Sequence, residues 1–206
     1  MKEKVERHVL LRLIKALNDG EELTTVSKIV SADSNLTAKV LRFVNSAYSG
    51  LKRTITSVED AVAFLGYKKL KELALSLLLT SFLYEKEKEE LLEHLTFAYL
   101  TKFIARQELP AFADEAFIVG VLYPLYLEAG QELLEVLKEA GVASEVVEGL
   151  RDGASPLGRL RKTAQETLKE CLRLARDEIE ELPANKNLTR ACLEAYLEAE
   201  KIVELL

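Results

Sequence analysis

Apolar residues recur at three- and four-residue intervals along most of the chain, which is the spacing of one face of an α-helix. In the segment from about Lys4 to Leu17 this stripe comprises Val9, Leu10, Leu13, Ile14 and Leu17. The same pattern predicts further helices over residues 22–30, 33–50, 56–66, 67–84, 86–108, 114–129, 131–140, 144–153, 155–182 and 187–206. No segment of five or more residues shows the strict alternation of a half-buried strand. The pattern therefore predicts an all-α protein with an irregular multi-helix architecture.

Capping residues and helix stops mark several of these boundaries. Asp33, Ser57 and Ser155 stand where a side-chain oxygen can accept a hydrogen bond from the first turn of the following helix. Gly66 is expected to end one helix and to let a new one begin. Pro124 lacks a backbone N–H, so we expect it to kink or end the helix over 114–129.

The helix over residues 67–84 is apolar nearly all round, which predicts that neighbouring helices enclose it. Its most apolar run, Leu73–Leu83, has 11 residues, fewer than the ~20 needed to span a bilayer. The first eight residues are too charged for the apolar region of a secretory signal. We therefore expect a cytoplasmic protein without a membrane segment.

Composition and charge narrow the class of partner. The chain has 206 residues, of which 49% are hydrophobic and 30% charged, and its 28 basic and 34 acidic residues give a net charge of −6. This balance fits a compact, helix-rich protein and excludes disorder. A net negative charge also creates no overall positive potential that would attract nucleic-acid phosphates, so we expect no nucleic-acid partner.

The two cysteines, Cys171 and Cys192, lie on apolar helical stripes and form no metal-binding spacing. Cysteine on such a stripe behaves as a small hydrophobic residue. We expect two reduced, buried thiols and no zinc site, the alternative being a bridge between them.

The residues offer little for catalysis or cofactor binding. His8 and His94 are the two histidines of the sequence, whereas a hydrolytic metal centre normally needs several histidines in one pocket. No glycine-rich phosphate loop and no nucleophile elbow occurs. The sequence thus predicts neither a bound metal nor another cofactor.

A spaced set of residues between positions 33 and 66 is the most specific motif. The set comprises Asp33, Leu36, Lys39, Leu41, Arg42, Asn45, Ser46, Ala47, Ile55, Ser57, Ala61, Leu65 and Gly66. In residue types and spacing it resembles the signature of the HDOD domain family. Residues 116–122 and 153–160 look like the HDOD variant that follows EAL-type cyclic-di-GMP phosphodiesterase domains.

The resemblance implies a fold related to the HD-domain phosphohydrolases, but without their metal ligands. It implies one HDOD-like domain over 1–206, with the signature in 1–110 and a degenerate HD region plus C-terminal helices in 111–206. Tyr123 and Pro124 stand where an HD hydrolase carries its His-Asp dyad, and neither side chain replaces those ligands. His94 falls near the position of the family's first helix histidine.

Packing explains much of the signature, because Asp33 serves as a cap and Asn45 could satisfy backbone groups at a helix end. Packing does not require two cations, Lys39 and Arg42, three residues apart on one helix face. Our hypothesis is that Lys39, Arg42, Asn45 and Tyr48 form a partner or ligand surface.

The favoured function is a noncatalytic signalling module that binds a sensor kinase, a receiver or a bacterial cyclic-di-GMP turnover domain, with homo-oligomers also allowed. This function is inferred from the resemblance together with the lack of a set of metal-binding residues. Because Met1 lies at the edge of the domain, both a stand-alone adaptor and an excised output domain are open. One alternative is a residual metal-dependent phosphohydrolase using His94 with carboxylates. Another is a cyclic-dinucleotide sensor using Arg159 and Arg161.

Overall fold

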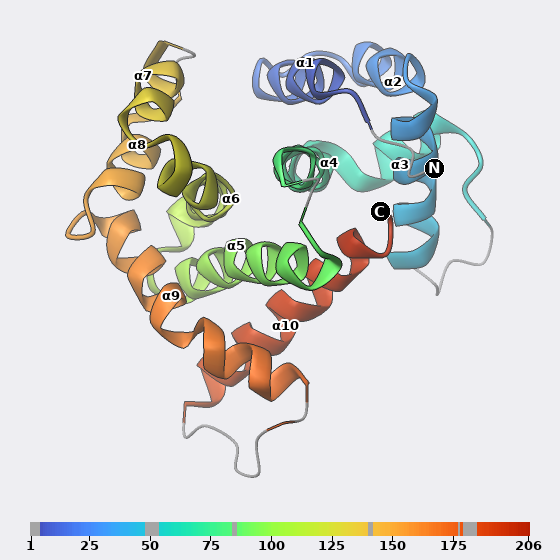
Figure 1. Ribbon diagram of the computed structural model, residues 1–206. Coiled ribbons are helices and arrows are strands. Elements are labelled where there is room, and N and C mark those ends of the chain that lie inside the picture. Colours follow the sequence, from blue (N-terminus) through green and yellow to red (C-terminus); the bar gives the residue numbers. More distant parts are fainter. Residues whose placement is uncertain (1–4, 48–53, 84–85, 140–141, 177, 179–184) are drawn as a thin grey trace. The chain divides into compact units, whose positions relative to one another are not determined.

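The computed structural model describes residues 5–47, 54–83, 86–139, 142–176, 178 and 185–206 (Figure 1). Its helices are α1 (Arg7–Asn18), α2 (Leu23–Ser31), α3 (Ser34–Ala47), α4 (Val58–Phe82), α5 (Lys88–Glu108), α6 (Ala113–Ala129), α7 (Gln131–Glu139), α8 (Ser144–Arg151), α9 (Pro156–Ala175) and α10 (Lys186–Val203), with a 3₁₀ turn η1 (Pro110–Phe112). No strand occurs in these ranges, which confirms the all-α prediction.

The chain divides into two compact units. Unit 1 comprises Met1–Glu85 together with Lys201–Leu206, and unit 2 comprises Lys86–Glu200. The boundary after Glu85 falls inside the expected signature half 1–110. Helix α10 starts in unit 2, and its last residues belong to unit 1.

Unit 1 is built around α4, which packs against α1, α2 and α3. The residues of α4 from Leu73 to Ser81 are all buried, as the all-round apolar pattern predicted. Gly66 interrupts the helix with a φ of 67° and a ψ of 173°, in the left-handed region that glycine adopts without a steric penalty. The sequence thus located the break correctly, and the two helical segments meet directly there.

Unit 2 is built around the pair α5 and α6, with α8 and α9 against α6 and α7 against both α6 and α8. The pair is close at Gly120, where an added Cβ would lie 2.6 Å from the Cα of Ala98. Pro124 does not end α6, which continues to Ala129 and stops before Gly130, with a φ of 55°. Packing of α6 against α5, α7, α8 and α9 outweighs the local cost of the proline, which the sequence pattern alone did not reveal.

The three predicted caps are confirmed. The Leu36 amide donates to Asp33 Oδ1 over 2.8 Å, and the Asp60 amide donates to Ser57 Oγ over 3.0 Å. Ser155 Oγ accepts from the Gly158 amide, with a proline at the first position of α9. These local signals fix where the helices begin.

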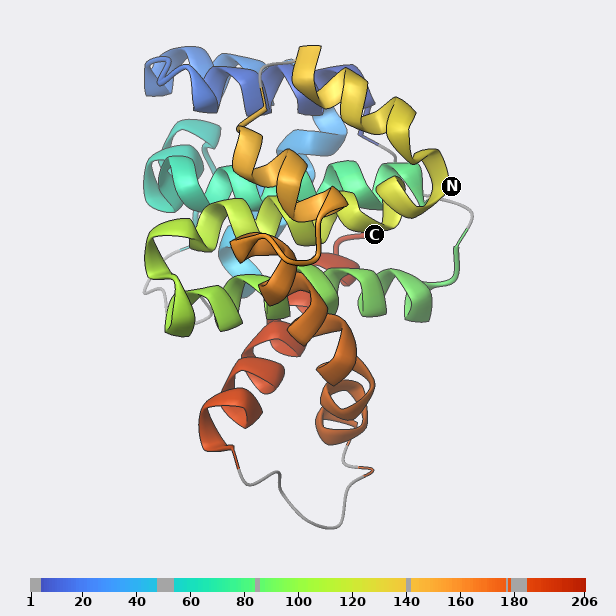
Figure 2. The same cartoon turned by 90° about the vertical axis from the view of Figure 1, so that its left-hand side faces the viewer.

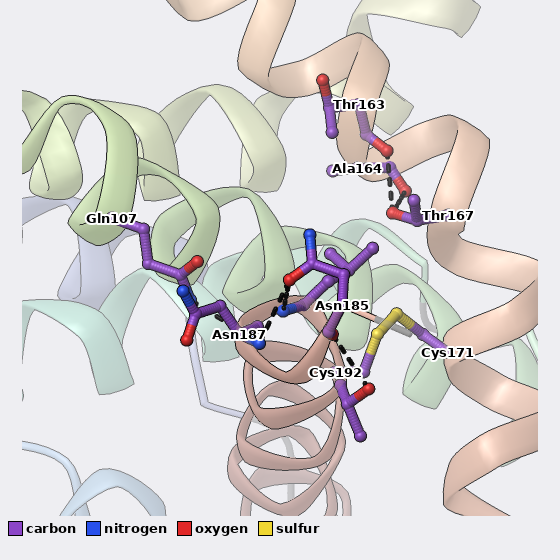
Figure 3. Close-up of a disulfide and its surroundings, with 10 residues drawn as sticks. Gln107, Thr163, Ala164, Thr167, Cys171, Asn185, Asn187 and Cys192 are labelled. Carbon is purple, nitrogen blue, oxygen red and sulfur yellow. Dashed lines mark hydrogen bonds between the residues drawn. A yellow bond between two sulfur atoms is a disulfide. The ribbon is translucent and has the colours of Figure 1, made fainter. Parts of the chain in front are cut away.

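The expectation of reduced thiols is wrong, because Cys171 of α9 and Cys192 of α10 form a disulfide with a Cα–Cα distance of 5.0 Å (Figure 3). Both residues are buried as expected. The sequence did not reveal that α9 and α10, the neighbouring orange and red helices in Figure 2, bring these two residues together. Disulfides are rare in the reducing cytosol of mesophiles and common inside hyperthermophiles. The bridge therefore fits the expected cytoplasmic location in a hyperthermophile and argues against it in a mesophile.

One helical stretch in the described part of the chain, Pro110–Ala129, is long and apolar enough to cross a membrane by length and composition alone. In the structure 44% of the apolar 18-residue window within that stretch is buried inside the protein. Core helices of folded proteins pass the same test, and α6 packs here as a core helix of unit 2.

We predict that removing the disulfide lowers the free energy of unfolding. The bridge closes a loop with a sequence separation of 21 residues, and the chain-entropy model gives about 3 kcal/mol for a loop of this size. Urea denaturation of the oxidised protein and of a Cys171→Ala/Cys192→Ala variant measures the difference. Unchanged stability in the double variant, or two titratable thiols in the oxidised protein, would contradict the prediction.

We also predict that Gly120→Ala destabilises unit 2, by about 2 kcal/mol, because the new methyl group meets the backbone of α5. Gly153→Ala is the matched control, since its Cβ would meet only the flexible end of Lys162. Thermal unfolding of both variants tests the contact. Equal melting temperatures for the two would show that α5 and α6 are not in close backbone contact.

Candidate functional site

The position expected for the metal-binding dyad lies in the second half of α6 and is occupied by Tyr123 and Pro124. Pro124 is buried and Tyr123 is half-buried. The Tyr123 ring lies 5.9 Å from the Phe97 ring of α5, centroid to centroid. The Cζ atom of Arg161, on α9, stands 4.1 Å from the centroid of the same tyrosine ring. An aromatic ring beneath a cation thus occupies the dyad position.

Arg161 is held firmly at this place. Its side chain is 4% exposed, its Nε donates to the Gly149 carbonyl over 3.0 Å, and its Nη1 donates to Gln165 Oε1 over 2.7 Å. A buried guanidinium opposes a divalent cation nearby, because the two charges repel in a medium of low dielectric constant. The arrangement at Tyr123 therefore disfavours a metal ion electrostatically as well as through its missing ligands.

His94 lies on α5, one turn before Phe97, and its Nε2 stands 3.8 Å from Glu90 Oε1. Lys86 Nζ contacts the same carboxylate oxygen at 2.8 Å. Partial burial lowers the pKa of His94, against the opposite effect of Glu90, and this favours the neutral imidazole. Within the described ranges, no cluster of three or more His, Cys, Asp or Glu side chains is suited to hold a metal ion.

The expected surface on α3 divides into residues with different surroundings. Lys39 is 7% exposed, and its Nζ donates to the carbonyl oxygen of Leu205. Arg42 is exposed, and its Nη2 donates to the carbonyl of Glu204 over 3.2 Å. Both cations thus face the end of α10 within unit 1. Tyr48 lies outside the described residues.

Asn45 connects the end of α3 to the chain before α4. Its Nδ2 donates to the carbonyls of Leu41 and Ile55, and its Oδ1 accepts from the Ile55 amide over 2.9 Å. Every polar atom of the amide group therefore has a backbone partner. The packing explanation that the sequence left open thus accounts for this asparagine.

The arginines considered for nucleotide binding are also engaged inside unit 2. Arg159 is exposed and its Nη1 donates to the Ala154 carbonyl over 2.6 Å, while Arg161 makes the contacts given above. The sequence missed the involvement of Leu205 and Glu204, because no motif links α3 to residues 162 or more positions away. It also missed the pairing of Arg161 with the Tyr123 ring, for the same reason.

Comparison with known proteins agrees with the fold and the motif. The family model of the HDOD domain matches residues 6–126. A curated relative, the cyclic di-GMP phosphodiesterase CdgJ of Vibrio cholerae serotype O1, is 26% identical over 175 residues, which cover 82% of this chain and 39% of the relative. The chain thus spans about two fifths of the length of that relative.

A solved structure shares the fold. It is a protein of Shewanella amazonensis SB2B named "Putative phosphohydrolase", with a TM-score of 0.64 and 16% sequence identity, and the match covers 100% of this chain and 95% of the other. The likeness shows a fold of the HD phosphohydrolase type. The finer resemblance to the variant that follows EAL domains stays a prediction. Because the family model covers more than half of the chain and the signature residues stand at its spacing, the chain belongs to the HDOD domain family.

Proposed function

We propose that this protein is a noncatalytic regulatory module that acts by binding another protein. The observation that carries the proposal is the buried Arg161 guanidinium above the Tyr123 ring, at the position that the family resemblance assigns to the His-Asp dyad. Without that metal, the chemistry of an HD hydrolase has no activated water. What remains of the fold is a helical surface, which suits recognition.

The proposed partners are signalling proteins: a sensor kinase, a receiver or a cyclic-di-GMP turnover domain. The name of the curated relative, a cyclic di-GMP phosphodiesterase, supports this signalling context. The match covers 39% of that protein. Regulation would follow from unequal affinity for two states of the partner, since equal affinity shifts no equilibrium. We propose that the exposed Arg42 of α3 contacts the partner protein. We also propose that the protein acts in the cytoplasm.

A second candidate is a residual phosphohydrolase, which the names of the relative and of the structural neighbour favour. In this chain it would use His94 with Glu90, the carboxylate 3.8 Å from the imidazole. One imidazole and one carboxylate leave most of a metal's coordination sphere to water. We therefore rank this candidate below the binding module.

We predict that the purified protein does not hydrolyse cyclic di-GMP in the presence of Mn²⁺ or Mg²⁺. The reason is that Tyr123 and Pro124, the residues at the expected dyad position, do not replace the metal ligands, and that Arg161 adds a positive charge beside them. Product formation followed by chromatography, for the wild type and for His94→Ala, tests the point. Hydrolysis by the wild type that is lost in His94→Ala would establish the phosphohydrolase instead.

The nucleotide-sensor alternative is tested separately by calorimetry. We predict no heat of binding when cyclic di-GMP is titrated into the protein, because Arg159 and Arg161 already donate to backbone and side-chain oxygens of unit 2. Saturable binding that Arg159→Ala weakens would support the sensor.

We predict that Arg42→Glu weakens partner binding at least tenfold. Candidate kinases, receivers and cyclic-di-GMP enzymes from the source organism are screened pairwise against the wild type, and the affinity of each interacting pair is then measured for the variants. Arg12→Glu is the matched control, because Arg12 is an exposed arginine on α1 of the same unit. A partner that binds Arg42→Glu and the wild type equally would exclude this part of α3 as the contact.

A further inference from the structure

Helix α10 carries apolar residues on an exposed face as well as on a buried one. Its buried face in unit 2 comprises Ala191, Cys192, Ala195 and Ala199. The disulfide to α9 holds that face toward the neighbouring helix (Figure 2). Leu193 and Leu197 lie outside the buried face, and their side chains are 39% and 55% exposed. Among the exposed large apolar residues of the described ranges, they are the pair that stands four positions apart on one helix, where side chains are neighbours.

The two leucines form the middle of a longer stripe on this exposed face. The α10 stripe comprises Arg190, Leu193, Leu197 and Glu200, at successive intervals of three, four and three residues. Alternating intervals of three and four keep side chains in one line along a helix, as in the seam of a coiled coil. Arg190 is exposed and Glu200 is half-buried. The stripe therefore has a basic end, an apolar centre and an acidic end, all within unit 2.

The charges around the stripe follow the same order. Lys186 is exposed one turn before Arg190, and the first turn of α10 contains no acidic residue. Arg190 Nε donates to Glu194 Oε1 over 2.7 Å, in an exposed pair that water screens. Lys201, which follows Glu200, lies about 100° further around the helix axis and so off the stripe. Cations at the first turn oppose the helix dipole, so acidic side chains brought there from outside would stabilise this end of α10.

A second copy of α10 in antiparallel orientation supplies those acidic side chains. When Leu193 of one copy faces Leu197 of the other, Arg190 faces Glu200, because each charged residue lies three positions outside its leucine. Two-fold symmetry makes each of these contacts occur twice. A parallel pair would instead place Arg190 against Arg190 and Glu200 against Glu200, and such like-charge contacts are unfavourable. The stripe is thus complementary to itself in the antiparallel orientation alone.

We propose that the α10 stripe is the contact surface of a homodimer in which two copies of α10 pack antiparallel across a two-fold axis. Two leucines from each copy form the apolar centre of this interface. Because that centre is small, the dimer belongs to the weak, reversible class of complexes rather than to the obligate one. The inference does not rest on the proposed function, since the partner contact proposed above is Arg42 on α3.

Sedimentation velocity of the oxidised full chain, from about 10 μM to about 1 mM, measures the association. We expect the sedimentation coefficient of the wild type to rise with concentration. Arg190→Glu and Glu200→Arg should each weaken the dimer at least tenfold, because each variant sets like charges against one another at both ends of the interface. Arg151→Glu is the matched control, since Arg151 is an exposed arginine on α8 of the same unit, and it should dimerise as the wild type does.

An equimolar mixture of Arg190→Glu and Glu200→Arg tests the antiparallel register. In the mixed dimer, both acidic side chains of one copy face both basic side chains of the other. We therefore expect the mixture to associate at least tenfold more tightly than either variant alone. A pair of variants that had merely lost their fold would not regain association on mixing.

Three results would overturn the proposal: a wild type that stays monomeric over the whole range, a dimer that neither charge reversal weakens, or two weakened variants that do not associate when mixed. Circular dichroism checks that both variants are folded. If Arg190→Glu is not, Leu197→Ser replaces it, and unchanged dimerisation of that variant would equally contradict the interface. The proposed binding function would survive each of these results, because its test depends on Arg42.

Discussion

The close approach of α5 and α6 at Gly120 is the contact on which unit 2 depends. With glycine at this position the backbone of α6 lies against Ala98 of α5, where a Cβ would come within 2.6 Å of the alanine Cα. The same packing keeps α6 helical through Pro124 and brings Tyr123 next to Phe97. Arg161 then covers the tyrosine from α9. The packing of two helices thus brings an aromatic ring and a buried cation to the position that the resemblance assigns to the dyad.

The sequence revealed the fold where local chemistry decides it. The caps at Asp33, Ser57 and Ser155 and the break at Gly66 are properties of a few neighbouring residues, and each of them is confirmed. Tyr123 and Pro124 could likewise be compared directly with the His-Asp dyad of the HD hydrolases, because that comparison needs only the residue types. A helical pattern and a specific motif therefore sufficed for the fold class and the family.

The sequence did not reveal what depends on residues far apart in the chain. The partner of Cys171 is 21 positions away, and the acceptors for Lys39 and Arg42 are more than 160 positions away. Periodicity says which face of a helix is buried but not what it faces, so an apolar stripe did not distinguish a free thiol from a bridge. The same limit explains why Lys39, a cation expected at the surface, is buried.

The central claim is that this member of the HDOD family has no metal-binding centre at the position of the dyad. Electron paramagnetic resonance of Mn²⁺ tests it directly, because binding to a protein site broadens the six-line signal of the free ion. The account predicts that adding stoichiometric protein leaves the signal of free Mn²⁺ at full intensity. Loss of that signal with the wild type, and its recovery with His94→Ala, would contradict the account.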